Sequence, residues 1–349
     1  MHMINNKYNL PACKTHSKAR EGGFSLIELM VAMVIGLLIL VGLSSIFISS
    51  NRSSVEMRKS TQQQENGRYA SQLLYDDLML AGYTAEFDSS LLTTPATLPN
   101  ICSTDMAVLL EGLPLHVQGI NDATVTPSCL TDLKDNTDII VVKRASTCVT
   151  GATGCDAFLA NAPHFQASLC TPSSGSSELA FEATSNAEYA ANHFAFSDTS
   201  GSFTRKKTSC GTTVADIHRY LVHIYFIANN NEAGDSIPTL KRADIGAGSF
   251  SIVPLVDGIE DMQVQYGIDA NDDGVPDNYS SAPASVDDWR NAMAARVYLL
   301  ARTTVSTPGW KDARTYELGD KTVDPVGDSY KRRVYSTAVQ FVNPSWRRQ

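Results

Sequence analysis

The sequence of 349 residues lacks the motifs of the common enzyme classes. It has no G-x-S-x-G nucleophile elbow, no H-E-x-x-H zinc motif and no glycine-rich phosphate loop. No two cysteines have C-x-x-C spacing, and the histidines are scattered, so a zinc site is not indicated. The adjacent carboxylates Asp76 and Asp77 fall in a predicted helix, where neighbours point in different directions, so we expect a solvated or sheet-contacting face rather than acid–base chemistry. These absences predict a protein that is not an enzyme.

Positive charge is also scarce. The chain has 28 lysines and arginines against 37 acidic residues; beyond residue 23 the numbers are 24 and 36, a net charge of −12. So acidic a protein lacks the basic surface that attracts the phosphates of nucleic acid. We therefore do not expect nucleic acid as a partner. The basic clusters are short, and we expect them at solvated strand ends or in loops: Arg205-Lys206-Lys207, Lys331-Arg332-Arg333 and Arg347-Arg348.

Charge is almost absent from residues 24–48, where Glu28 is the one ionisable side chain. A helix of this length spans a bilayer, and a carboxylate near its start is costly in lipid, which marks a functional residue. Cleavage after Gly23 would give Phe24 a free α-amine that Glu28 of a neighbouring subunit can neutralise. A secretory signal peptide has a shorter apolar core that precedes its cleavage site, whereas this run follows it. A plain signal anchor needs no glutamate at this depth.

The joint spacing of Gly23, Phe24, Glu28 and the apolar run resembles the class III signal of type IV pilins and pseudopilins. The resemblance implies that a prepilin peptidase cuts between Gly23 and Phe24 and methylates the new N-terminal Phe24, with Glu28 acting in assembly. The leader, residues 1–23, carries Lys7, Lys14, Lys18 and Arg20 against Glu21. Positive residues stay cytoplasmic, so we expect a single-pass inner-membrane protein with a periplasmic head.

Cysteine usage fits an oxidising compartment. Cys13 lies in the leader, and the remaining six are Cys102, Cys129, Cys148, Cys155, Cys170 and Cys210. An even number beyond the membrane predicts three disulfides, for which 15 pairings exist and the sequence does not choose among them. Pairing of sequence neighbours would join Cys102 to Cys129, Cys148 to Cys155 and Cys170 to Cys210. The flexible turn from Thr150 to Gly154 favours the middle pair.

One long helix is expected at the N-terminus, over residues 24–82, with residues 24–48 in the membrane. No proline occurs between Phe24 and Tyr83, and an apolar face continues beyond the membrane at spacings of three and four residues: Tyr69, Leu73, Leu74, Leu78 and Ala81. We expect the helix to run from about Ser25 to Leu80 and to stop at Gly82.

The rest of the chain predicts an antiparallel sheet. Residues 83–215 hold all six cysteines and are rich in turn formers, which indicates a Cys-rich, loop-rich insertion; residues 216–349 form the sheet part of the head. Strands are expected over 138–143, 220–227, 262–268, 295–301 and 334–341. Consecutive strands without helical spacers favour antiparallel pairing, so the fold class is α+β, with the long helix packed on the sheet.

The segment Asp269–Asp277 follows the calcium-loop pattern D-x-[DN]-x-[DN]-G. Oxygen side chains occupy loop positions 1, 3, 5 and 9, and position 7 would supply a carbonyl; these residues are Asp269, Asn271, Asp273, Asp277 and Val275. Position 12 is Ser280 rather than glutamate, so Asp287, Asp288 or water would have to complete the shell. The alternative is an acidic turn without metal, because the same residues dominate turns. Calcium as a cofactor stays open.

Three segments resemble PilW-type minor pilins of the type IV pilus: residues 74–83, 255–267 and 332–343. They cover the helix end and the last third of the chain; the middle third carries no such resemblance. The family implies a type IV pilin-like fold and a low-abundance subunit that helps initiate pilus assembly in a tip complex, with other minor pilins and the major pilin as partners. Two alternatives remain: a J-like pseudopilin of type II secretion, and a membrane-anchored adhesin that uses the Cys-rich region.

Overall fold

The computed structural model describes residues 23–170 and 186–348. The predicted leader, apart from Gly23, therefore lies outside the described residues. Contacts divide the chain into two units, residues 1–55 and residues 56–349. The first unit contains the N-terminal part of helix α1 (Leu26–Met79), and the second unit is the head, which begins with the remainder of that helix.

Helix α1 extends over 54 residues, close to the predicted range. An 18-residue window of it has a mean hydropathy of 2.8, and the helix is long and apolar enough to cross a membrane. The helix ends because Gly82 has a φ of +72°, a left-handed conformation that glycine adopts without strain. A Cβ there would also lie 2.9 Å from the His116 Cβ, so both backbone and space require glycine.

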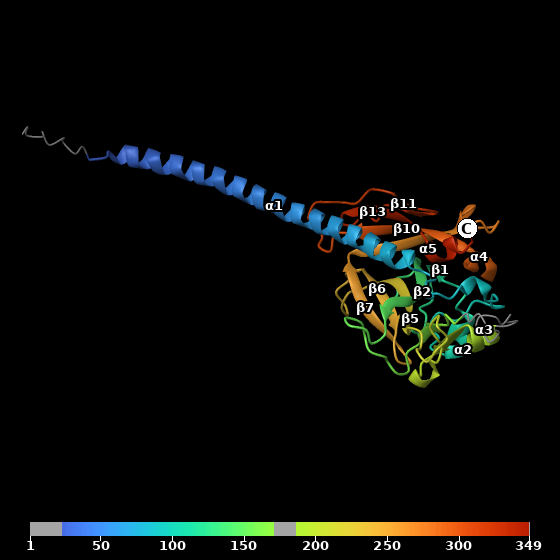
Figure 1. The fold of residues 1–349 in the computed structure, drawn as a ribbon. Coiled ribbons are helices and arrows are strands. Elements are labelled where there is room, and N and C mark those ends of the chain that lie inside the picture. The colour runs from blue at the N-terminus through green and yellow to red at the C-terminus, as the bar shows by residue number, and fades with distance from the viewer. Residues whose placement is uncertain (1–22, 171–185, 349) are drawn as a thin grey trace, which may run out of the picture. The chain divides into compact units, whose positions relative to one another are not determined.

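The head contains two antiparallel sheets and a small hairpin (Figure 1). The first sheet has seven strands: β1 (Val117–Ala123), β2 (Thr137–Val149), β5 (His218–Ala228), β3 (His164–Ala167), β4 (Phe194–Ser197), β6 (Thr239–Ile245) and β7 (Phe250–Asp257). The second has the order β13 (Arg332–Gln340), β10 (Ala292–Arg302), β8 (Ile259–Ile268) and β9 (Asn278–Ser280). The hairpin pairs β11 (Tyr316–Leu318) with β12 (Lys321–Val323). Short helices in the described chain are α2 (Met106–Glu111), α3 (Asn186–Asn192), α4 (Val286–Arg290) and α5 (Val342–Trp346).

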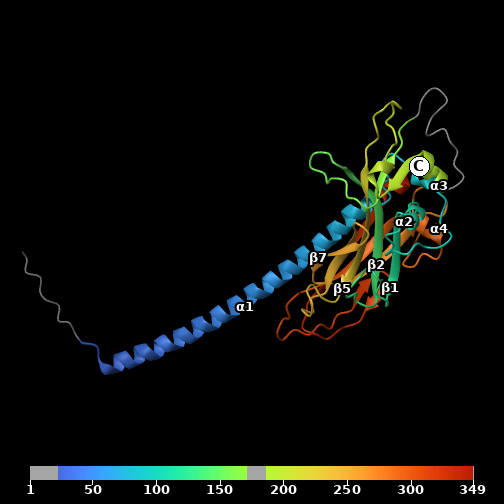
Figure 2. The same cartoon turned by 90° about the horizontal axis from the view of Figure 1, so that it is seen from below.

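The Cys-rich part of the chain shares a sheet with the part that follows it. Strand β2 pairs along β5, and Figure 2 shows β1, β2 and β5 side by side. Their outer face packs on a second apolar cluster that includes Phe87, Phe165 and Phe194. Residues 83–215 thus supply central as well as peripheral parts of the head.

The two sheets are connected along the chain by a single residue, Gly258, which joins β7 to β8. Its N–H donates to the Pro238 carbonyl at 2.7 Å, and its carbonyl accepts from the Arg302 N–H at 2.7 Å. With a φ of +75° and a would-be Cβ only 2.7 Å from the Arg302 carbonyl oxygen, this position admits glycine alone without a backbone shift.

The head half of α1 packs its apolar stripe into the main core as predicted, except that Tyr69 is exposed and Ala70 takes its place in the core. Ala70, Leu74 and Leu78 are fully buried and share a cluster with Tyr225 of the first sheet and Leu299 of the second. Each buried leucine contributes roughly 2 kcal/mol through burial of apolar surface. This confirms the α+β, pilin-like fold class.

The expectation for the basic clusters was wrong at several of their arginines. The Arg332 side chain is fully buried and forms ion pairs with Glu260, Asp312 and Asp328. Arg347 donates to the Gly82 and Phe87 carbonyls, which fixes the C-terminal end to the start of the head. The planar, five-donor guanidinium suits such multiple contacts, and nothing in the local sequence distinguishes it from a solvated arginine.

Candidate functional site

The N-terminal end of α1 is built by a reciprocal cap. Ser25 precedes the first helical residue, and its Oγ accepts from the Glu28 N–H at 3.4 Å. The Glu28 carboxylate in turn accepts from the Ser25 N–H at 3.0 Å. This is the capping box S-x-x-E, which satisfies two N–H groups that the helix leaves unpaired, and the carboxylate also lies at the positive end of the helix dipole. The charge pattern of the sequence, on which the prediction for Glu28 was based, does not reveal this capping role.

The predicted scissile bond lies just outside this cap. Gly23 and Phe24 precede the helix, and the Phe24 side chain is 89% exposed. A peptidase that cuts between them would leave the capped helix intact. The position of the bond therefore fits proteolytic processing before the membrane segment.

A buried charged group fixes α1 to the head. The Asp77 carboxylate accepts from Arg144 Nε at 2.8 Å and from the Tyr225 hydroxyl at 2.8 Å, and it lies 2.7 Å from His223 Nδ1. Burial disfavours the Asp77 charge, but the hydrogen bonds and positive charges of His223 and Arg144 outweigh it and hold the pKa of Asp77 well below its ordinary value. This site was not predicted from the sequence, although Asp77 lies three residues from Leu74 on the apolar stripe, a position that itself indicates a buried carboxylate.

Comparison with known families separates two parts of the chain. A family model described as the prokaryotic N-terminal methylation motif matches residues 18–44. A second, described as Type IV Pilus-assembly protein W, matches residues 224–343, from β5 to α5. These two matches support a type IV minor pilin of the PilW type. No match was found among curated proteins or solved structures.

The two matches account for the membrane end and for most of the sheet that α1 packs on. The methylation motif and the apolar helix fit a membrane-anchored pilin. Both matched families are structural pilus components. The matched range 224–343 contains two of the three segments on which the resemblance to PilW-type pilins was based, residues 255–267 and 332–343.

Processing of this PilW-type pilin gives a direct prediction. Gly23→Glu will leave the leader attached, because a side chain at the last leader residue enlarges the group that the peptidase must accommodate. Intact-mass measurement of the membrane protein will show wild type beginning at Phe24 and the variant beginning at its original N-terminus. A wild-type protein that retains its leader would contradict the predicted cleavage site.

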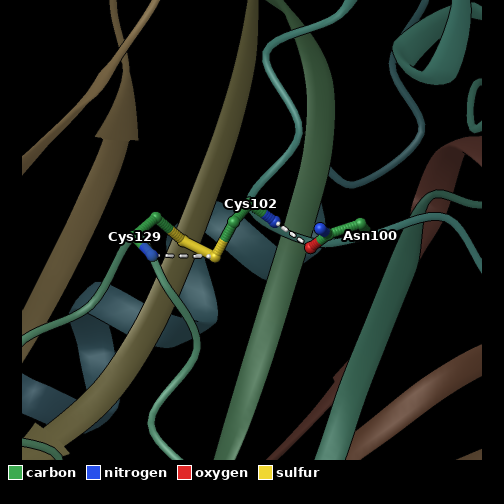
Figure 3. The surroundings of a disulfide bond; sticks show 3 residues. All are labelled: Asn100, Cys102 and Cys129. Atoms are coloured by element: carbon green, nitrogen blue, oxygen red, sulfur yellow. Dashed lines mark hydrogen bonds between the residues drawn. A yellow bond between two sulfur atoms is a disulfide. The ribbon is translucent and has the colours of Figure 1, made fainter.

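Three disulfides are formed, and they join sequence neighbours: Cys102–Cys129, Cys148–Cys155 and Cys170–Cys210. At the first, the Cys129 N–H donates to Cys102 Sγ and the Cys102 N–H donates to Asn100 Oδ1 at 2.9 Å (Figure 3). Both cysteines also pack against the second apolar cluster, so this bridge connects the loops to a core.

Removing the Cys102–Cys129 bridge from the pilin will destabilise the head by about 3–4 kcal/mol, the chain-entropy value for a loop of this length. The double variant Cys102→Ser, Cys129→Ser avoids leaving a free thiol. The shorter Cys148–Cys155 loop serves as the comparison, with about 2.5 kcal/mol expected for its double variant. Urea unfolding of the full chain in detergent measures both, and an equal loss in the two variants would contradict the loop-length argument.

The acidic loop of the pilin is organised by its own backbone. Asp269 Oδ1 accepts from the Asp273 N–H at 3.2 Å and Oδ2 accepts from the Gly274 N–H at 2.8 Å. Arg348 pairs with Asp269 and with Asp272. Burial opposes the Asp269 charge, but these N–H groups and Arg348 outweigh it and lower the pKa of Asp269. No group of three metal-ligating side chains of His, Cys, Asp or Glu converges anywhere in the described chain.

Other loop residues are also engaged in turn contacts. Asp273 Oδ1 accepts from the Val275 N–H, and Asp277 Oδ2 accepts from the Ala270 N–H. Asn271 Nδ2 donates to Asp273 Oδ2 at 3.2 Å. Of the residues considered for completing a calcium shell, Asp288 caps helix α4 instead. The geometry is that of an acidic turn, and calcium binding stays a proposal.

Calcium binding by this loop is testable by melting. If the loop binds the ion, millimolar Ca²⁺ will raise the melting temperature of the full chain, since a ligand of the folded state stabilises it by mass action. Mg²⁺ will have a smaller effect because it requires stricter octahedral geometry. Asp273→Ala will abolish the difference. A melting temperature indifferent to both Ca²⁺ and chelator would leave this segment as a turn held by Arg348.

Proposed function

We propose that this pilin helps to initiate assembly of the type IV pilus, as a non-enzymatic subunit of a small complex with other minor pilins at the pilus tip. The major pilin would add below that complex. Before assembly the protein would be anchored in the inner membrane by residues 24–48, with its head in the periplasm.

The observation that supports this proposal is that one chain contains both a pilin-like N-terminus and a PilW-type C-terminal sheet. The N-terminus has the predicted cleavage site directly before a capped helix whose first turn contains the only carboxylate of the apolar run. The C-terminal third has the PilW-type sheet. The first part provides the features needed to enter a helical pilus core, and the second distinguishes the chain from a major pilin.

Deletion of the gene tests the proposal. We expect loss of surface pili, restored by the wild-type gene, with exoprotein secretion unchanged. Loss of secretion with normal piliation would instead support a pseudopilin of type II secretion, which has the same fold and processing. Electron microscopy of cell surfaces and assay of secreted proteins in one strain set distinguish these outcomes.

A further inference from the structure

Strand β13 is a long edge strand without the usual protection. Its nine residues pair with β10 without a register shift, and within the described residues its other side has no partner strand. Proteins usually protect such edges with bulges, prolines or short length. The other edges of the described sheets have these devices: β1 and β7 contain register shifts, β7 contains Pro254, and β4 and β9 have four and three residues.

The hydrogen bonds at both ends of the ladder determine which residues face outward. The Thr303 N–H donates to the Lys331 carbonyl at 3.0 Å, and the Phe341 N–H donates to the Met293 carbonyl at 2.8 Å. Odd-numbered residues of this strand therefore pair with β10, since the two sets alternate in an antiparallel ladder. The even-numbered residues direct N–H and C=O away from the sheet: Val334, Ser336, Ala338 and Gln340. Within the described residues, no hydrogen bond is made to these backbone groups.

A groove of about 500 Å³ lies beside this edge, between β13 and α1. Its α1 side is formed by Arg68, Ser71, Gln72 and Tyr75, and its strand side by residues 335–337. The Tyr335 ring packs directly on α1, where a Cβ at Gly67 would lie 2.3 Å from it, and the Tyr335 hydroxyl is buried without a partner among the described residues. The groove thus combines a backbone edge with the aromatic rings of Tyr75 and Tyr335.

The charge beside the groove is positive, although the chain as a whole is acidic. Arg68 lines the groove, and the Arg333 guanidinium lies 5.6 Å from the centre of the Tyr335 ring. Burial raises the pKa of Tyr335, and the positive charges of Arg333 and Arg68 oppose that rise. Both guanidinium groups therefore lie close enough to the phenol to act on it. None of the described residues that line the groove carries a carboxylate. An occupant with carboxylates would be complementary here.

We propose that the free edge of β13 accepts an extended, carboxylate-bearing segment of another pilus subunit as an added strand. The segment pairs with the outward backbone groups at residues 334–340, and its carboxylates contact Arg68 and Arg333. A second copy of the same edge fits poorly, since β13 presents the exposed Arg333 and contains no carboxylate. The identity of the occupant as a pilus subunit rests on the proposed function, whereas the free edge is seen in the strand pairing itself.

Two substitutions at one position test the strand pairing in cells. Ser336→Pro removes an outward N–H without removing a bond to β10, and proline is tolerated on edge strands. Ser336→Ala keeps the N–H and removes only the hydroxyl. We expect at least a tenfold loss of surface pili for the proline variant and none for the alanine variant, with both full-length proteins equally resistant to protease in membranes. Normal piliation in a stable proline variant would overturn the proposal.

Charge provides a test if the proline variant misfolds. Arg333 is exposed, so Arg333→Glu leaves the core intact, whereas Arg333→Lys preserves the charge. We expect at least a tenfold loss of pili for glutamate and less than a twofold loss for lysine. Equal piliation in the two variants would overturn the predicted charge of the occupant.

Cross-linking in whole cells identifies the occupant. A photo-crosslinking residue at Ala338 will attach to an acidic, extended segment of another subunit with a class III signal, whereas the same residue at Val125, an exposed loop position, will not. A product with the mass of two copies of this chain would overturn the proposed occupant. Attachment from Tyr69 on α1 but not from Ala338 would overturn the free-edge site and leave the proposed function standing. No attachment from either position would contradict both.

Discussion

Replacing Asp77 with alanine will destabilise the head by about 3–5 kcal/mol, the usual cost of removing one partner from a buried charged group. The change leaves Arg144 and His223 without their shared carboxylate next to the core. Because Asp77 lies on α1 and its partners lie on β2 and β5, the loss falls on the attachment of the helix to the first sheet. Urea unfolding of the full chain in detergent measures the free-energy change.

The adjacent carboxylate provides the matched control. Asp76 is exposed and contacts Gln72 on its own helix, so Asp76→Ala will change stability by less than about 0.5 kcal/mol.

The pH dependence of the free energy of unfolding gives a second check on the role of Asp77. Since the pKa of Asp77 is lowered in the folded head, its contribution is fully present above pH ~4 and is lost as pH falls below that value. Wild type and Asp77→Ala should therefore converge in acid; a constant difference down to pH 2 would contradict the charged role.

Replacing Glu28 with leucine will abolish incorporation into pili while leaving insertion and cleavage intact. The apolar run becomes more apolar, so the membrane segment still inserts. In the filament, however, the α-amine of a neighbouring subunit would lose the carboxylate that neutralises it in a low-dielectric environment. Intact mass reports cleavage, and immunodetection of the chain in sheared pili reports incorporation.

Glu28→Gln separates the two roles of this side chain. Glutamine at the third helical position still accepts from the Ser25 N–H, so the capping box is kept while the charge is removed. If the charge is what assembly requires, the glutamine and leucine variants will fail alike. Incorporation of the glutamine variant at wild-type level would show that the cap, rather than the ion pair, is the essential contribution.

Local patterns were sufficient for α1 and for five of the strands, whereas the remaining strands of the described chain were not predicted. Lack of proline and the apolar stripe predict α1 within one or two residues of its observed ends, and period-two or continuous apolar runs locate β2, β5, β8, β10 and β13. Helix and strand formation depend largely on residues that are close in sequence, so these elements can be recognised from the sequence alone. The N-terminal site is equally local, since Gly23, Phe24, Ser25 and Glu28 lie within six residues.

What could not be predicted depends on residues distant in sequence. Asp77 meets Arg144 and His223 across 67 and 146 positions. Arg332 meets Glu260 across 72 positions, and in sequence it appears as one of three adjacent cations. The local sequence favoured only one of the three disulfides, Cys148–Cys155. The entropy of loop closure changes slowly with loop length, so it discriminates weakly among the other possible pairings. The division of the strands between two sheets depends on the conformation of Gly258, which its sequence context does not reveal.

That one-residue junction has a mechanical consequence. Gly258 is bonded to Pro238 before the first sheet's β6 and to Arg302 at the end of β10, so its N–H and its carbonyl connect neighbouring strands on either side of the corner. A pull applied to β13 passes through its ladder to β10, and from Arg302 across the glycine into the strands that the disulfide-bridged loops adjoin. Tension on the second sheet is therefore transmitted to the first through the hydrogen bonds of Gly258 with Pro238 and Arg302, and these bonds resist rotation of one sheet about the junction. Force applied to the second sheet would thus be transmitted to the first through this corner.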